Sequence, residues 1–213
     1  MKHSFLRWLA LGLVIAPVAQ AKVIYDNSTK PEGKSLVSNV EFGDQVILDT
    51  SFYPTAKLNS FVFEYFGVNF SGNEEARIRF YKNDGVNGKP GSLIFDSQAF
   101  EVPEAPTGAS VDLGDLGLVV VPSSFTWTVT FTGVDAANGE SAGLNLYAPP
   151  TVGKGFSDYW ERSGNDWALK SIAGADASFA AFIDGVPVIP EPSTVALSVA
   201  GIALLGAASR RRK

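Results

Sequence analysis

The chain has 213 residues, no cysteine, one histidine and a net charge of −5. The absence of cysteine excludes a disulfide framework and a thiol nucleophile, and the single histidine, His3, lies at the extreme N-terminus. The rest of the chain is therefore without Ser–His triads, cysteine catalysis and most zinc or redox-metal sites.

The first 21 residues have the layout of a secretory signal peptide. Lys2 and Arg7 supply positive charge, residues 8–18 are apolar, and Ala19-Gln20-Ala21 is an A-x-A site. We expect signal peptidase to recognise Ala19 and Ala21 and to cut before Lys22. The alternative, an N-terminal membrane helix, is disfavoured because the apolar run is short.

Residues 22–184 are predicted to form one domain, followed by a linker at 185–189 and a C-terminal segment at 190–213. Without the two terminal segments the chain keeps 11 cations and 21 acids, so its net charge becomes −10. No basic patch remains, and we expect no nucleic-acid partner.

The domain is predicted to be all-β, because aromatic and β-branched residues alternate with polar ones. Residues 57–66, 76–81 and 125–131 show this clearly: Phe61, Phe80 and Trp127 fall on inward faces. Turn residues separate the strands, and no stretch has a sustained helical period. An antiparallel two-sheet β-sandwich, jelly-roll-like, is expected. Weaker strands are expected at 22–26, 45–48, 92–95, 99–102, 116–121, 143–147, 159–162, 167–170 and 178–183.

The loop at 83–88 is rich in oxygen donors. Asn83, Asp84 and Asn87 could ligate Ca²⁺, which prefers hard oxygen ligands. The spacing is not that of an EF-hand, and Asn-Asp-Gly is also ordinary chemistry for a tight turn. Both interpretations stay open, and no other cofactor is expected.

Two aromatic segments flank a short loop near residue 164 and predict a hairpin. Tyr159, Trp160 and Trp167 could stack on sugar rings at its surface, which would make a glycan-binding face. A domain this rich in aromatic residues also needs large side chains in its core, so some of these rings could be buried.

Paired acids could support glycoside hydrolysis instead. The candidate pairs are Glu74 with Glu75, Glu101 with Glu104, and Glu161 with Asp166. The alternative is that these residues are ordinary solvated acids in loops.

The C-terminal segment has three parts in order. Pro190-Glu191-Pro192 comes first, 195–208 is an apolar run of 14 residues, and Arg210, Arg211 and Arg212 precede a terminal lysine. As a helix the run would reach about 21 Å at ~1.5 Å per residue, which is short for a bilayer core of roughly 30 Å. The terminal cations would keep that end cytoplasmic. A weak permanent tail anchor is the alternative to a processed signal.

This segment resembles the PEP-CTERM sorting signal of certain Gram-negative bacteria. The resemblance implies cleavage by an exosortase, transient residence in the inner membrane, and delivery to the outer envelope or exterior, often in producers of extracellular polysaccharide. Segments 77–85, 89–95 and 125–129 are similar to segments of uncharacterised PEP-CTERM surface proteins. This similarity implies no particular activity for the domain.

The sequence therefore predicts an exported, non-catalytic envelope or matrix protein with a structural or polysaccharide-associated role. Its expected partners are signal peptidase, exosortase and extracellular polysaccharide. The alternatives are a secreted carboxylate-dependent glycan-active enzyme and a calcium-stabilised adhesion module.

Overall fold

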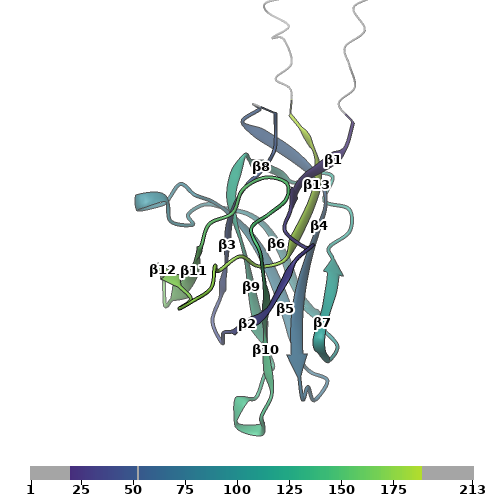
Figure 1. Ribbon diagram of the computed structural model, residues 1–213, viewed down its shortest axis with the longest axis vertical. Coiled ribbons are helices and arrows are strands. Elements are labelled where there is room, and N and C mark those ends of the chain that lie inside the picture. The colour runs from purple at the N-terminus through teal and green to yellow at the C-terminus, as the bar shows by residue number, and fades with distance from the viewer. Residues whose placement is uncertain (1–19, 52, 189–213) are drawn as a thin grey trace, which may run out of the picture.

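The computed structural model describes residues 20–51 and 53–188, which form thirteen strands (Figure 1). Two 3-10 turns lie in loops, and these ranges contain no α-helix, so the all-β class is confirmed. The elements are β1 Lys22–Asp26, β2 Pro31–Val37, β3 Phe42–Ile47, β4 Thr55–Val68, β5 Glu75–Lys82, η1 Val86–Gly88, β6 Leu93–Glu101, β7 Ala105–Asp112, β8 Val120–Pro122, β9 Ser124–Thr132, η2 Ala136–Asn138, β10 Ser141–Tyr147, β11 Asp158–Ser163, β12 Asp166–Ser171 and β13 Ala181–Pro187.

The strands form two antiparallel sheets. The seven-stranded sheet has the order β1-β13-β4-β10-β2, with β7 and β8 also paired to β4. The six-stranded sheet has the order β12-β11-β3-β9-β5-β6. With 14 residues, β4 is long enough to pair with β13 and β10 along one edge and with β8 and β7 along the other.

The inner faces of the sheets meet through the aromatic residues whose alternation is visible in the sequence. The ring centroid of Phe61 on β4 lies 4.9 Å from that of Phe80 on β5 and 5.3 Å from that of Trp127 on β9. All three side chains are fully buried. Because each sheet buries one apolar face against the other, the two-layer arrangement follows from the alternation. The jelly-roll-like strand order stays a prediction.

Two strands, β2 and β7, were not expected from the sequence. Both contain proline and glycine and few large apolar residues, and both are largely exposed. They lie at edges of the seven-stranded sheet, where proline is tolerated and little surface is buried.

One continuous strand, β6, replaces the two short strands expected near 92–95 and 99–102. Its pairing with β5 shifts register between Arg77 and Arg79, and Gln98 has a φ of 61°. This irregularity lets the polar Asp96-Ser97-Gln98 segment stay in the sheet.

Both ends of the described chain leave from the same end of the molecule (Figure 1). Lys22 on β1 pairs with Gly185 on β13, and the Val188 N–H donates to the Thr55 carbonyl at 2.9 Å. The strand β13 continues to Pro187, three residues past the expected domain boundary at 184.

Within residues 20–51 and 53–188, no helix has the length and apolarity needed to cross a membrane. The expected signal helix and the short C-terminal helix fall almost entirely on residues 1–19 and 189–213, outside the described part of the chain.

Candidate functional site

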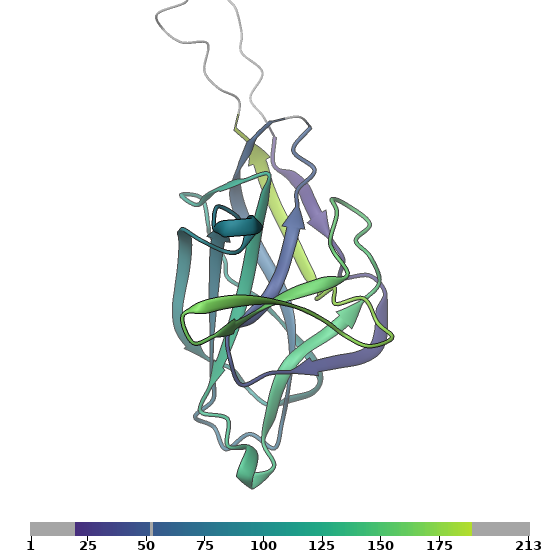
Figure 2. The same cartoon turned by 90° about the vertical axis from the view of Figure 1, so that its left-hand side faces the viewer.

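The hairpin of β11 and β12 lies across the outer face of the six-stranded sheet (Figure 2). Its two strands pair from Asp158 to Ser171, and Gly164 adopts a φ of 61° in the turn between them. β11 pairs with β3 only through Trp160 and Glu161, so the rest of the hairpin can extend over neighbouring strands. The ring centroid of Trp167 thereby comes 5.5 Å from that of Tyr81 on β5.

Glu41 is the hydrogen-bond acceptor at the centre of this covered face. Its Oε1 accepts from the Tyr81 hydroxyl at 2.9 Å and from Thr128 Oγ1 at 2.8 Å. Its Oε2 lies 2.9 Å from a guanidinium nitrogen of Arg79 and 3.0 Å from one of Arg162. Burial and the neighbouring carboxylate raise the pKa of the Tyr81 hydroxyl, so it remains a donor. Glu41 was not predicted as a site residue, because nothing in its local sequence distinguishes it from a loop acid.

The network continues to β6 through Asp96. Nε of Arg77 donates to Asp96 Oδ1 at 2.7 Å, and Nε of Arg79 donates to Oδ2 at 3.1 Å. The hydrogen bonds from Arg77 are the largest cause that lowers the pKa of Asp96, to about 2. The alternating arginines of β5 are therefore held on the outer face as ion-pair partners.

A groove of about 470 Å³ lies between the tip of the hairpin and the β5–β6 loop. Lys89 bridges its two walls, because its Nζ donates to the two oxygens of Asp166 at 2.9 and 3.0 Å. The guanidinium carbon of Arg162 lies 5.7 Å from the ring centroid of Trp167, which positions both side chains in the groove wall. Two segments that are far apart in sequence thus form one concave surface. The predicted calcium ligands Asn83, Asp84 and Asn87 do not line it.

The three aromatic residues predicted as a glycan platform are all buried. Tyr159 belongs to the main core, with its ring centroid 6.4 Å from Phe42 and 5.9 Å from Phe179. Trp160 and Trp167 form a separate cluster with Tyr81 and are 6% and 8% exposed. Of the three, only Trp167 lines the groove. A glycan-binding role for these residues stays a prediction.

The oxygen-rich loop uses its polar groups internally. Asp84 accepts from the backbone N–H and the hydroxyl of Ser92, both at 2.7 Å, and these bonds lower its pKa. Asn83 donates to Ser124 and accepts from Thr126. Asn87 has a φ of 59° in η1. Among the residues that the structure describes, no group of three or more acidic or histidine side chains is placed to hold a metal ion. Calcium binding here stays a prediction.

Four of the six acids considered as hydrolytic pairs have partners for their side chains: Glu74, Glu104, Glu161 and Asp166. Glu74 is buried, which would raise the pKa of its carboxyl, but hydrogen bonds from Ser71 and Gly72 outweigh burial and lower it to about 2. Glu104 accepts from the Asn69 N–H at 2.8 Å, and Glu161 lies 3.5 Å from Lys170.

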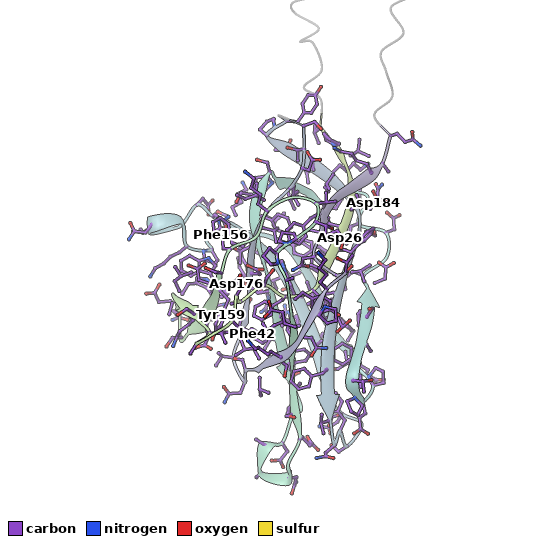
Figure 3. All side chains as sticks on the ribbon, in the orientation of Figure 1. Asp26, Phe42, Phe156, Tyr159, Asp176 and Asp184 are labelled. Carbon is purple, nitrogen blue, oxygen red and sulfur yellow. The ribbon has the colours of Figure 1, made fainter. Side chains whose placement is uncertain are left out.

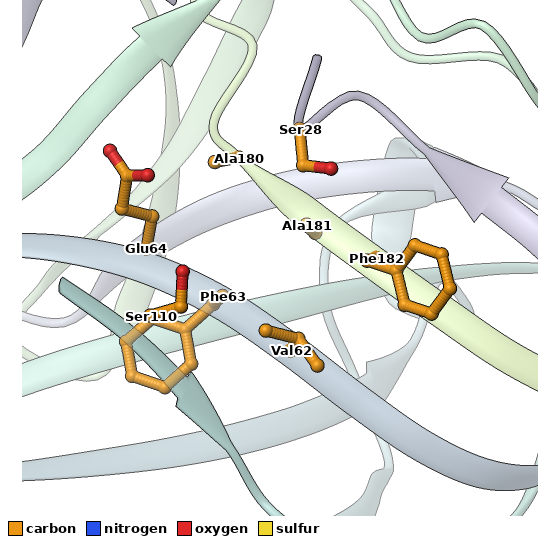
Figure 4. A pocket seen from close by; sticks show the side chains of 8 residues that line it. All are labelled: Ser28, Val62, Phe63, Glu64, Ser110, Ala180, Ala181 and Phe182. Atoms are coloured by element: carbon orange, nitrogen blue, oxygen red, sulfur yellow. The ribbon is translucent and has the colours of Figure 1, made fainter.

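A second hollow of about 270 Å³ lies on the outer face of the seven-stranded sheet, over β4 and β13 (Figure 4). Its carboxylate, Glu64, accepts from the Asn145 amide at 2.7 Å and from the Tyr147 hydroxyl at 2.8 Å. Burial and this carboxylate raise the pKa of Tyr147 to about 12. Both oxygens of Glu64 are thus engaged within the sheet.

The predicted processing residues lie next to the ends of the domain. Lys22 is the first residue of β1, so a cut before it leaves the strand whole. Ala21 is described but belongs to no strand, and Ala19 lies outside the described residues. The sorting residues Pro190, Glu191, Pro192, Arg210, Arg211 and Arg212 also lie outside them.

Comparison with protein families finds the PEP-CTERM protein-sorting motif at residues 188–213. No curated protein and no solved structure matches the chain. The chain therefore carries the signal of an exosortase substrate, which implies export through the membrane-associated exosortase to the envelope or extracellular space. The similarity of the domain to other PEP-CTERM surface proteins stays a prediction.

Proposed function

We propose that this chain is a non-catalytic envelope or matrix protein that is trimmed at both ends and associates with extracellular polysaccharide. The observation that carries the proposal is the position of the sorting motif. It begins at residue 188, and β13 ends at Pro187. Removal of the motif would therefore leave both sheets and the whole core in place.

The location of the two chain ends supports processing at a membrane. Because β1 and β13 are hydrogen-bonded neighbours, both processing sites lie at one end of the domain. Only residues 189–194 separate the domain from the apolar run, and six residues span at most about 22 Å. While the tail occupies the inner membrane, this end of the domain would face the bilayer and the opposite end would project away.

The groove beside the hairpin supports the polysaccharide part of the proposal. Its walls offer an aromatic ring at Trp167, a guanidinium at Arg162, an amide at Asn165 and the Lys89–Asp166 ion pair. Sugar hydroxyls both donate and accept hydrogen bonds, so such a mixture suits them. A net charge of −10 for residues 22–189 favours a neutral polymer over an acidic one.

The partners of the acids argue against the hydrolytic alternative. A general acid needs a raised pKa, but the hydrogen bond from Lys89 is the largest cause that lowers the pKa of Asp166. Asp166 is also paired on the surface and 77% exposed at its side chain. We therefore assign the groove a binding role.

Affinity electrophoresis tests the polysaccharide association. The processed protein, purified from the producing cells, is run in gels that contain the extracellular polysaccharide of the same cells, with calcium and then with chelator. We expect retardation that persists in chelator and that weakens in Asn165→Ala. Leu118→Ala is the control, because Leu118 is 96% exposed and lies outside the groove. Unretarded wild-type protein would contradict the association, and retardation lost in chelator would favour calcium as a bridge.

A further inference from the structure

Phe156 is 38% exposed, more than any other aromatic residue within 20–51 and 53–188. It lies in the loop between β10 and β11, three residues before the buried Tyr159. Protein covers the rest of its surface, so the ring is held in place while part of it stays accessible to solvent. Figure 3 shows Phe156 and Asp176 on the same side of the molecule as Tyr159 and Phe42.

The ring borders a pocket of about 230 Å³. Pro149, Pro150, Phe156, Ser157, Asp176 and Ser178 line it. Pockets for drug-sized ligands measure roughly 300–1,000 Å³, so this one suits a single small unit. It combines apolar walls with one carboxylate and two hydroxyls, the composition expected of a site that orients a ligand through a few polar groups.

The loop that carries Phe156 is fixed to both sheets. The backbone groups of Lys154 and Ile47 exchange two hydrogen bonds at 2.8 and 2.9 Å, and the Val152 N–H donates to the Asp26 carbonyl. On the other side of the pocket, the Ala177 N–H donates to the Ser157 carbonyl at 3.1 Å. Such anchoring lowers the entropy cost of binding, because the walls are already positioned.

Buried side chains close the pocket floor. A Cβ at Gly155, which lines the pocket, would lie 3.3 Å from the Tyr25 hydroxyl and 3.6 Å from Ser178 Oγ, so a glycine keeps this space open. Tyr25 and Ser178 are both buried, and Ser178 Oγ accepts from the Asn27 amide at 3.0 Å. Ser157 and Asp176 are exposed, so they supply the polar groups that a ligand can reach.

We infer that this pocket binds one neutral sugar ring of the polysaccharide. The C–H face of the ring would stack on Phe156, and its hydroxyls would donate to Asp176 and exchange hydrogen bonds with Ser157. The carboxylate of Asp176, with no cation among the lining residues, disfavours an acidic sugar. The inference rests on the proposed function and adds a subsite to it.

The pocket and the groove lie at opposite ends of one hairpin. Ser157 immediately precedes β11, whereas Asn165 and Asp166 lie at the turn. Six residues of strand span about 20 Å. A polysaccharide chain that follows the hairpin could therefore contact both sites at once, and occupancy of two sites would strengthen binding through effective concentration.

The test uses the same affinity gels and the processed protein from the producing cells. We expect Phe156→Ala and Phe156→Leu to bind the polysaccharide about 3- to 10-fold more weakly, as for loss of one stacking contact. Phe156→Trp, which keeps a ring, should bind as well as wild type or better. Asp176→Asn should weaken binding because a neutral amide is a poorer acceptor. The melting temperature of each variant is compared with that of wild type, so that binding lost through unfolding is recognised.

The outcomes separate the inference from the proposed function. If wild type is retarded and Phe156→Ala is retarded equally, the subsite is wrong and the association stands. An equal loss of polysaccharide binding in Phe156→Leu and Phe156→Trp would also overturn a stacking role for Phe156. If the wild-type protein is not retarded, the proposed polysaccharide association is wrong, and the subsite that rests on it is wrong as well.

Discussion

Single residues on the outer face of the six-stranded sheet hold the hairpin in place, and Glu41 is the most connected of them. Its carboxylate is 6% exposed and binds two guanidinium groups and two hydroxyls. A buried charge is tolerated only when it is paired and hydrogen-bonded, so each partner depends on the others. The groove wall at Arg162 therefore depends on an acid that does not itself line the groove.

Glu41→Ala should lower the free energy of unfolding by about 3–5 kcal/mol, because the Tyr81 and Thr128 hydroxyls lose their acceptor and Arg79 keeps only Asp96 as an ion-pair partner. Tyr81→Phe removes only one hydrogen bond to a charged group and should cost about 1.5–3 kcal/mol. Urea unfolding measures both. Lys170→Ala, at an exposed pair, is the control and should stay within about 0.5 kcal/mol of wild type. A Glu41→Ala effect as small as that of the control would show that the network is not cooperative.

Asp96 should make stability depend on pH in the acid range. Its pKa in the folded protein is about 2, against about 3.9 for an unperturbed aspartate. The unfolded chain therefore binds more protons between these values, and stability falls as pH drops from about 4 to about 2. Asp96→Asn should be less stable than wild type at pH 6, and its stability should decline less over that window. Unfolding curves at pH 6, 4, 3 and 2.5 test this, and parallel decline in the two proteins would contradict it.

At the scale of elements, the strands with strong alternation could be predicted from the sequence, whereas the edge strands could not. Phe61, Phe80 and Trp127 alternate with polar neighbours and are buried as expected. The exposed strands β2 and β7 gain their structure from pairing with a neighbour, a tertiary effect that local pattern does not contain. The hairpin itself was predictable from its turn, but its placement over β5 was not.

That placement explains why the predicted aromatic platform is buried. Trp160 and Trp167 lie on the hairpin face that turns toward Tyr81, so the rings pack against protein. Alternation tells which residues share a face but not whether that face is covered. For the same reason the exposed Phe156, which has no periodic context in its loop, could not be distinguished from core aromatics by sequence.

Gly43 should be essential to the placement of the hairpin. It pairs with Trp160 of β11 on one side and with Thr128 of β9 on the other, and a Cβ there would lie 2.0 Å from the Trp127 carbonyl oxygen. Gly43→Ala should therefore destabilise the domain by about 1–3 kcal/mol. In Gly117→Ala the nearest atom is the end of the Asp115 side chain, which can move, so this control should be nearly neutral. Thermal unfolding compares the two, and equal melting temperatures would contradict the assigned role of Gly43.

At the scale of the whole molecule, we propose that both terminal segments can be removed without disturbing the domain. The strands β1 and β13 bring the two expected processing sites to one end, and the core lies entirely between them. In this proposal the opposite end, the groove and the Phe156 pocket stay accessible to a polymer outside the cell. The sorting signal could be identified in the sequence from the order of its three parts. A proline-rich turn, an apolar run and terminal cations can be recognised locally, whatever the fold of the preceding domain.

Intact-mass measurement of the protein recovered outside the inner membrane tests whether the chain is processed at both ends. We expect a chain that begins at Lys22 and lacks residues 210–213, while deletion of the exosortase should leave the C-terminus whole in the membrane fraction. A Pro190→Ala, Glu191→Ala, Pro192→Ala triple variant should behave as the deletion does. Recovery of the full C-terminus through Lys213 from the outer envelope or the medium would contradict the account.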